Sequence, residues 1–236
     1  MINIKNILVI VLLLLGLNAQ SQVLLSILFG DKLNSDGLEF GLEGGFNFSD
    51  ISELEADKDL SSFNIGFYFD IRLKNQWNLY TGVLVKAKMG ADELSPNDLE
   101  FLEIVPNPEE GTYSQKINYF VVPILIKYNF KNRIYLEAGP QASLMHKAWV
   151  EYNSEIGDIT TRIRYSNKDK INPIDAGFTV GTGYKIMPNT GMTIGVKYYY
   201  GLTNVYKNAT GTNNSSWFLK LNIPIGASKN EKDKTL

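Results

Sequence analysis

The sequence of 236 residues contains no cysteine and only one histidine. The absence of cysteine excludes disulfide bridges, thiolate nucleophiles, zinc–thiolate sites and a lipid-modified N-terminal cysteine. One histidine, His146, cannot form a histidine-rich metal site. No nucleophile motif accompanies it, so a structural or interface role is favoured over that of a general base. We therefore expect a protein that is not an enzyme, with no catalytic residue, metal ligand, cofactor or small-molecule substrate.

The sequence also lacks a strong charge of either sign and a long hydrophobic run. The formal net charge is −2, which gives no electrostatic argument for binding nucleic acid. Beyond the N-terminus, no apolar run approaches the ~20 residues that a membrane-spanning helix needs. A helical membrane span is therefore not expected in the mature chain.

The N-terminus has the pattern of an export signal. Lys5 supplies a positive charge, residues 7–15 are uninterrupted apolar positions, and Ala19 and Ser21 are small residues suitably placed before a cleavage site. A transmembrane anchor is the alternative, but the apolar run is too short for one. The pattern predicts a signal peptide over 1–21.

A periplasmic N-terminal segment is expected over 22–37. Within it, residues 23–30 form a second apolar patch that is also too short to span a membrane. The patch would pack locally, lie at the membrane interface or contact a partner, and the sequence alone does not decide among these.

Alternation of apolar and polar residues with a period of two dominates the rest of the chain. The last such segment has an apolar face of Trp217, Leu219, Leu221, Ile223 and Ile225, whereas the opposite face includes Lys220 and Asn222. The same alternation recurs at about 38–48, 61–73, 77–88, 116–130, 134–152, 173–186 and 192–202. Each segment therefore predicts a strand with one apolar and one polar face.

The connections alternate in length. They are short after the second, fourth and sixth segments and long after the first, third, fifth and seventh. Such asymmetry is typical of outer-membrane barrels, in which apolar side chains face lipid. A soluble barrel would instead bury its apolar face. We predict an all-β fold, an eight-stranded antiparallel up-and-down transmembrane β-barrel over 38–226 with long extracellular loops, short periplasmic turns and a polar tail at 227–236. Outer-membrane lipid is thus an expected partner.

The polar faces of the strands are expected to fill the lumen with a charge-balanced network, because an eight-stranded barrel is only wide enough for its own side chains. A narrow selective channel is the alternative. Inward glycines, among them Gly41, Gly181, Gly183 and Gly195, would make room for long side chains. The predicted inward acids are Glu39, Glu43, Asp70, Glu137 and Asp175, and the predicted inward bases are Arg72, Lys86, Lys88, Lys127, Lys185, Lys197 and Lys220.

Two of the long connections are rich in carboxylates. Residues 49–60 and 89–115 carry clustered Asp and Glu without the spacing of an EF-hand. They would form a solvated acidic rim, bind a cation or contact a basic partner. Apolar residues in 89–115 suggest that this loop folds back on the barrel or meets a partner. Within 147–172, residues 149–152 and 159–165 are expected to pair as a hairpin above the membrane.

Three stretches resemble the PorT-like outer-membrane β-barrel family of Bacteroidetes: Leu38-Glu-Phe-Gly-Leu-Glu-Gly-Gly-Phe-Asn47, Tyr119-Phe-Val-Val-Pro-Ile-Leu-Ile-Lys-Tyr-Asn-Phe130 and Tyr135-Leu-Glu-Ala-Gly-Pro-Gln141. The resemblance implies an outer-membrane component of the type IX protein secretion and gliding machinery, with secretion-machinery proteins as partners. The alternative is a stand-alone surface barrel for adhesion or envelope integrity. The chain departs from a common habit of such barrels because it ends in a polar tail rather than in Phe.

Overall fold

The computed structural model describes residues 37–187 and 191–225. The predicted signal peptide over 1–21, the apolar patch over 23–30 and the polar tail over 227–236 lie outside the described residues.

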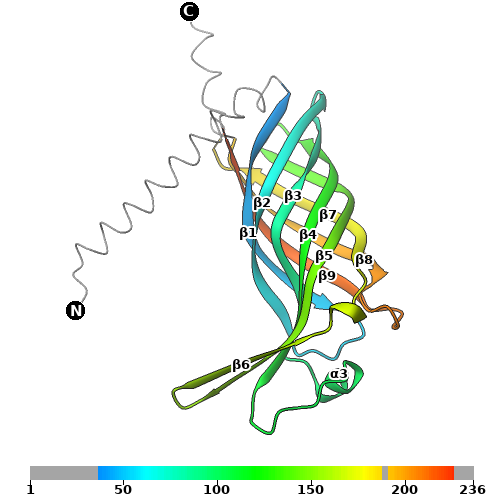
Figure 1. Cartoon of the computed structure of the whole chain (residues 1–236). Coiled ribbons are helices and arrows are strands. Elements are labelled where there is room, and N and C mark those ends of the chain that lie inside the picture. The colour runs from blue at the N-terminus through cyan, green and yellow to red at the C-terminus, as the bar shows by residue number, and fades with distance from the viewer. Residues whose placement is uncertain (1–36, 188–190, 226–236) are drawn as a thin grey trace, which may run out of the picture.

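The fold is one closed antiparallel sheet (Figure 1). The sheet has nine strands in the order β4-β3-β2-β1-β9-β8-β7-β5-β6, and pairing of β4 with β5 closes eight of them into a barrel. The barrel strands are β1 (Leu38–Ile51), β2 (Lys58–Lys74), β3 (Trp77–Asp92), β4 (Thr112–Asn129), β5 (Ile134–Ile156), β7 (Ile174–Lys185), β8 (Thr193–Asn204) and β9 (Asn213–Pro224). The predicted all-β, eight-stranded up-and-down barrel is confirmed.

The ninth strand, β6 (Ile159–Ser166), pairs only with the outer half of β5, from Trp149↔Ser166 to Ile156↔Ile159. Together they form the hairpin that the sequence predicts, and Figure 1 shows it projecting away from the barrel. A short 3-10 helix, η2 (Lys168–Lys170), leads from the hairpin back to β7.

The barrel is apolar outside, as predicted. Every barrel strand contributes large exposed apolar side chains. They include, from β1 to β9, Phe46, Phe63, Val85, Ile124, Leu136, Phe178, Ile194 and Trp217. Lys197, Lys220 and Asn222, which alternate with such residues, are buried. A barrel with an apolar outer surface is stable only in lipid. In water, the apolar side chains of this belt would be exposed to solvent.

The two ends of the barrel differ. The connections β2–β3, β4–β5 and β7–β8 lie at one end. The other end carries the long β3–β4 connection and the β5–β6 hairpin, and it is therefore the extracellular end. Several strands continue further in that direction than the alternation predicts. β1 reaches Ile51, β2 begins at Lys58 and β4 begins at Thr112. The acidic connections are accordingly shorter than 49–60 and 89–115, since their outer residues are paired in strands.

The interior has two parts. Toward the periplasm it is polar, whereas the extracellular part holds a cluster of buried apolar residues that includes Ile51, Leu84, Met89, Ile117 and Val150. The extended strand ends explain this change. Beyond the membrane the wall is surrounded by water, so the strands bury their apolar residues inside as a soluble barrel does.

Candidate functional site

The polar part of the lumen holds three buried ion pairs. Lys197 Nζ lies 2.7 Å from Glu43 Oε1, Lys127 Nζ lies 2.6 Å from Asp70 Oδ2, and Lys220 Nζ lies 2.5 Å from Glu137 Oε1. Six of the twelve side chains predicted to balance charge in the lumen therefore do so directly. The pairing compensates for the high cost of removing each ion from water.

Asp175, another predicted inward acid, is held by neutral donors instead of a cation. The hydroxyl of Tyr199 and the amide of Asn214 donate to its carboxylate over 2.8 and 2.9 Å, and Thr203 donates over 3.1 Å. Glu39 accepts a hydrogen bond of 2.8 Å from the hydroxyl of Tyr68. These tyrosines supply the hydrogen bonds that buried carboxylates need.

Tyrosine rings fill much of the space between the pairs. The Lys220 ammonium lies 4.1 Å from the ring centre of Tyr80, and the Lys127 ammonium lies 4.3 Å from that of Tyr135. Tyr80 and Tyr119 are both 0% exposed, so water does not reach these rings from either end. The lumen therefore holds a packed network, which argues against the narrow-channel alternative.

The structure corrects the predicted lumen at three positions. Arg72 is exposed near the periplasmic strand ends, whereas Lys185 at the same end is half-buried, as the predicted inward Glu39 is. Lys86 and Lys88 point outward, because β3 carries a β-bulge between Leu84 and Ala87. Leu84 pairs with Val121 and Ala87 pairs with Tyr119, so β3 has one extra residue there. One inserted residue moves every following side chain to the opposite face.

The long acidic connection between β3 and β4 folds back over the extracellular mouth. This is one of the two arrangements expected for it from the sequence. It contains α3 (Pro96–Phe101), and Leu94, Leu99 and Leu102 join the apolar cluster of the barrel. The helix was not predicted. Ser95 caps it and forms a capping box with Asp98, with Pro96 in the first turn, and this Ser-Pro-x-Asp pattern is the sequence feature by which it could have been found.

The carboxylates of the acidic connections act in separate contacts. Asp98 accepts backbone hydrogen bonds from Ser95 and Glu55, Glu93 pairs with Lys58 over 2.6 Å, and Glu103 pairs with Lys170 over 2.8 Å. In residues 37–187 and 191–225, no three carboxylate or histidine side chains converge as a metal site would require. Several of these acids thus have a structural role, as a helix cap or as one member of an ion pair.

His146 is itself an extra residue in β5, at a second β-bulge comparable to the one in β3. Asn118 pairs with Lys147 and Tyr119 pairs with Met145, which leaves His146 without a partner in the ladder. Its ring stacks on Phe120 at a centroid distance of 4.7 Å. This packing fits the structural role expected for it.

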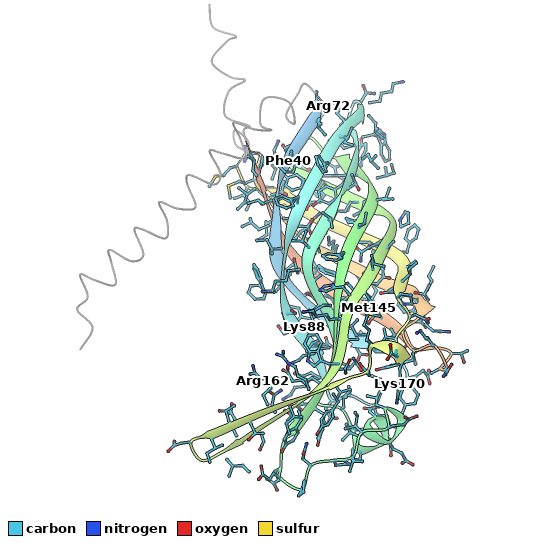
Figure 2. The ribbon with its side chains drawn as sticks, viewed as in Figure 1. Phe40, Arg72, Lys88, Met145, Arg162 and Lys170 are labelled. Carbon is cyan, nitrogen blue, oxygen red and sulfur yellow. The ribbon has the colours of Figure 1, made fainter. Side chains whose placement is uncertain are left out.

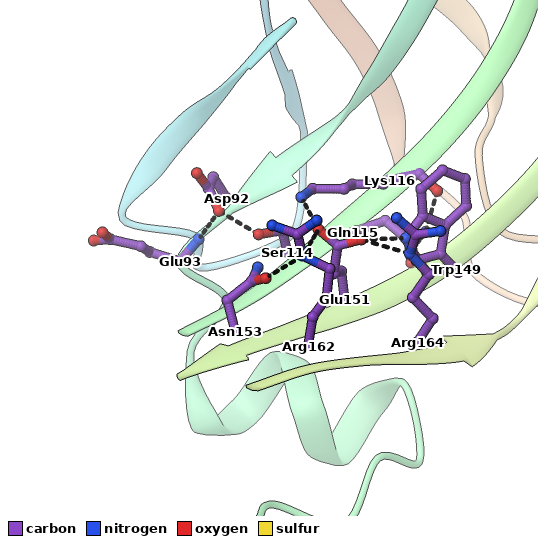
Figure 3. Close-up of polar contacts among 10 residues, drawn as sticks. All are labelled: Asp92, Glu93, Ser114, Gln115, Lys116, Trp149, Glu151, Asn153, Arg162 and Arg164. Carbon is purple, nitrogen blue, oxygen red and sulfur yellow. Dashed lines mark hydrogen bonds and ion pairs between the residues drawn. The ribbon is translucent and has the colours of Figure 1, made fainter. Parts of the chain in front are cut away.

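The base of the β5–β6 hairpin is organised around Glu151 (Figure 3). Lys116 Nζ lies 2.5 Å and Arg164 Nε lies 2.7 Å from its carboxylate, and the Trp149 indole nitrogen donates to it over 3.2 Å. Arg162 Nε lies 3.8 Å away. A single buried acid thereby joins β4, β5 and β6 beyond the apolar belt.

The Glu151 carboxyl is strongly acidic. Burial by itself raises its pKa, but hydrogen bonds from Lys116, Arg164 and Trp149 outweigh burial and lower the pKa from 4.5 to about 2. A folded-state pKa below the unfolded value means that the carboxylate stabilises the hairpin fully above pH 4.5. The stabilisation is lost as the pH falls from there through about 2.

We expect this titration to be visible in the fluorescence of Trp149. In a variant with Trp77→Phe and Trp217→Phe, emission should stay constant from neutral pH to about 4 and change only toward pH 2, because the pKa is depressed. Glu151→Gln in the same background should remove the transition. A transition centred near pH 4.5 would contradict the pairing.

The far end of the hairpin is exposed. Ile156 and Ile159 face each other beside the Gly157–Asp158 turn, and Ile159 is 70% exposed. The outer edge of β6 has no strand partner among the described strands. Figure 2 shows Arg162 on this arm, away from the barrel wall. The hairpin therefore presents apolar side chains and an open strand edge to the outside.

The fold and its apolar belt agree with a comparison of the sequence with protein families. The profile of the outer membrane protein beta-barrel domain family matches residues 18–207. The chain belongs to this family. Its members are outer-membrane proteins, so the outer membrane is the location of this barrel as well. A comparison with curated proteins gives no match.

Solved structures of small outer-membrane barrels are similar to this family member. Ail of Yersinia pestis is 13% identical, with a TM-score of 0.45, and the match covers 80% of this chain and 99% of Ail. Neisserial surface protein A is 9% identical with a TM-score of 0.41, covering 80% and 99%. OprG of Pseudomonas aeruginosa is 11% identical with a TM-score of 0.36, covering 80% and 93%. Among the described residues, no helix is long and apolar enough to cross a membrane.

Proposed function

We propose that this barrel is a non-enzymatic docking protein of the outer membrane, and that the β5–β6 hairpin binds an extended segment of another protein. The observation that carries the proposal is the free edge of β6 next to the exposed Ile156 and Ile159. An unpaired edge offers main-chain donors and acceptors to a partner strand. Exposed apolar side chains at its end add contact area.

The hairpin is built to hold this shape without a partner. A two-stranded ribbon alone is marginally stable in water. Here β5 continues directly from the barrel wall, and Glu151 ties β4 and β6 to it. Arg162 and Arg164 lie on the exposed strand, where charge reduces pairing with arbitrary strands. The arm is therefore suited to a partner that supplies a complementary segment.

Photocrosslinking in intact cells tests this docking role. A photoreactive phenylalanine analogue at Thr160, on the exposed edge, should give one discrete adduct, and the same analogue at Val105 should not. Val105 is the matched control because it is 83% exposed in the β3–β4 connection. Ile156→Ser with Ile159→Ser should reduce the adduct several-fold. An equal adduct from both sites, or one that the double substitution leaves unchanged, would contradict the proposal.

Two cellular roles are open to such a docking barrel. The resemblance of the strands at 38–47, 119–130 and 135–141 to the PorT-like family supports a component of type IX secretion. The extracellular arm supports adhesion or envelope integrity equally. Normal export of type IX cargo after deletion of the gene would argue against the secretion role. Copurification of the barrel with secretion components would argue against the stand-alone role.

A further inference from the structure

A second feature of the extracellular end is a basic pocket of about 520 Å³ on the outer wall, where the hairpin leaves the barrel. Figure 2 shows Lys88 at this level of the barrel, close to the base of the hairpin. The pocket includes five cationic side chains and no carboxylate. Its lining is Ser62, Lys86, Lys88, Asn118, Lys147, Ala148, Trp149, Arg164, Ser166 and Lys168.

The two strand irregularities build this pocket. The extra residue in β3 turns Lys86 and Lys88 outward, and the extra residue at His146 in β5 does the same for Lys147. Strands β3 and β5 both pair with β4, so the three lysines come to one face of the wall around Asn118 of β4. Without the irregularities these lysines would point into the apolar extracellular part of the interior. Bulges that redirect side chains are common at functional sites.

The cations of the pocket lack acidic partners in its lining. Of the five, only Arg164 has an ion pair with an acid, and that acid, Glu151, also binds Lys116. Lys88 and Arg164 both lie over the Trp149 ring, at 5.8 and 5.2 Å from its centre. Like charges gathered in this way repel one another unless an anion is bound. The pocket therefore favours a ligand that carries concentrated negative charge.

The position of the pocket indicates where this anion comes from. Directly toward the membrane the outer wall is apolar, with Phe63, Val85, Phe120 and Leu144 exposed to lipid. The Lys86 ammonium lies 5.5 Å from the ring centre of Phe63, so cationic and lipid-facing side chains adjoin. Trp149 in the pocket is a residue type enriched at membrane interfaces. A ligand with an anionic head and apolar chains satisfies both surfaces.

We propose that this pocket binds the phosphate group of an outer-leaflet lipid. Lysine and arginine supply charge-assisted hydrogen bonds to phosphate oxygens. Asn118 and Ser166 add neutral donors, and the acyl chains lie along the exposed apolar wall below. The site goes beyond the proposed protein docking, because Ile156, Ile159 and the outer strand edge at Thr160 are not part of it.

Native mass spectrometry of the full chain, refolded in detergent and freed of lipid, tests the site. Phosphorylated lipid A should bind the wild-type barrel. Lys86→Gln with Lys88→Gln and Lys147→Gln should weaken binding by about tenfold or more, since several charge-assisted contacts are lost. Lipid A without phosphates should bind all variants weakly. Replacing the same three lysines by arginine should retain binding, which separates loss of charge from loss of fold.

The matched control removes three other extracellular positive charges: Lys58→Gln, Lys170→Gln and Lys207→Gln. These lysines are exposed and already have partners, so this variant should bind lipid A like the wild type. Equal weakening in the control, or unchanged binding in the pocket variant, would overturn the proposal. Competition by inorganic phosphate at concentrations similar to those of the lipid would overturn the assignment to a lipid, because the apolar wall would then contribute nothing.

Discussion

Replacing Glu43 by alanine should destabilise the barrel by about 3–5 kcal/mol, because it leaves a buried cation without its counter-ion. Lys197 has a fully buried side chain, and its ammonium lies 2.7 Å from the Glu43 carboxylate. Glu43 also accepts a hydrogen bond from the hydroxyl of Tyr80, which would lose its acceptor. Urea unfolding in lipid vesicles, followed by tryptophan fluorescence, measures the change.

The matched control is the exposed ion pair of Glu103 and Lys170, in which the Glu103 side chain is 79% exposed. Glu103→Ala should cost at most about 1 kcal/mol, since solvent screens the pair. Glu43→Leu combined with Lys197→Met should recover much of the loss, because neither ion then remains buried. Equal effects of Glu43→Ala and Glu103→Ala would show that the lumen is hydrated.

Replacing Gly195 by alanine should destabilise the barrel by about 1–3 kcal/mol through overpacking. A Cβ at this inward position of β8 would collide with the Tyr135 hydroxyl oxygen, and it would lie 2.9 Å from the Thr182 carbonyl oxygen. The buried tyrosine cannot move aside easily, since cations lie against its ring. The same unfolding assay gives the size of the effect.

Two further variants separate this collision from a general effect of alanine in a strand. Gly44→Ala, in β1, should be nearly neutral, because the nearest atom to its Cβ is the Asn64 carbonyl oxygen at 3.9 Å. Tyr135→Phe should rescue part of the Gly195→Ala loss by removing the hydroxyl. Equal losses for Gly44→Ala and Gly195→Ala, or no rescue, would contradict the packing described for the lumen.

Much of the barrel could be predicted because lipid imposes one simple pattern on every strand. Each strand of a transmembrane barrel must expose apolar residues with a period of two. Trp217, Leu219 and Ile223 follow this rule, and Lys220 and Asn222 between them are buried as expected. The hairpin at β5–β6 could be predicted for a related reason, since its strands alternate around an obvious Gly157–Asp158 turn.

The outer strand ends were harder to predict, because the environment changes along a single strand. Beyond the apolar belt, water surrounds the wall, and the interior becomes the apolar side. Ile117 and Val150 are buried inside, whereas Lys116 and Glu151 face outward. A strand predicted from one environment along its whole length is therefore too short. The predicted strands stop before Ile51 in β1 and start after Thr112 in β4.

The sequence by itself determined the number of barrel strands, their sidedness within the apolar belt and the hairpin, because each follows from local periodicity. Only the tertiary structure decided the direction of Lys86 and Lys88. A single extra residue in β3 reverses the faces that follow it, and an extra residue is visible only when β3 is aligned with β4. The same alignment brings these lysines to Lys147 and Arg164, and so turns expected lumen charges into an external basic pocket.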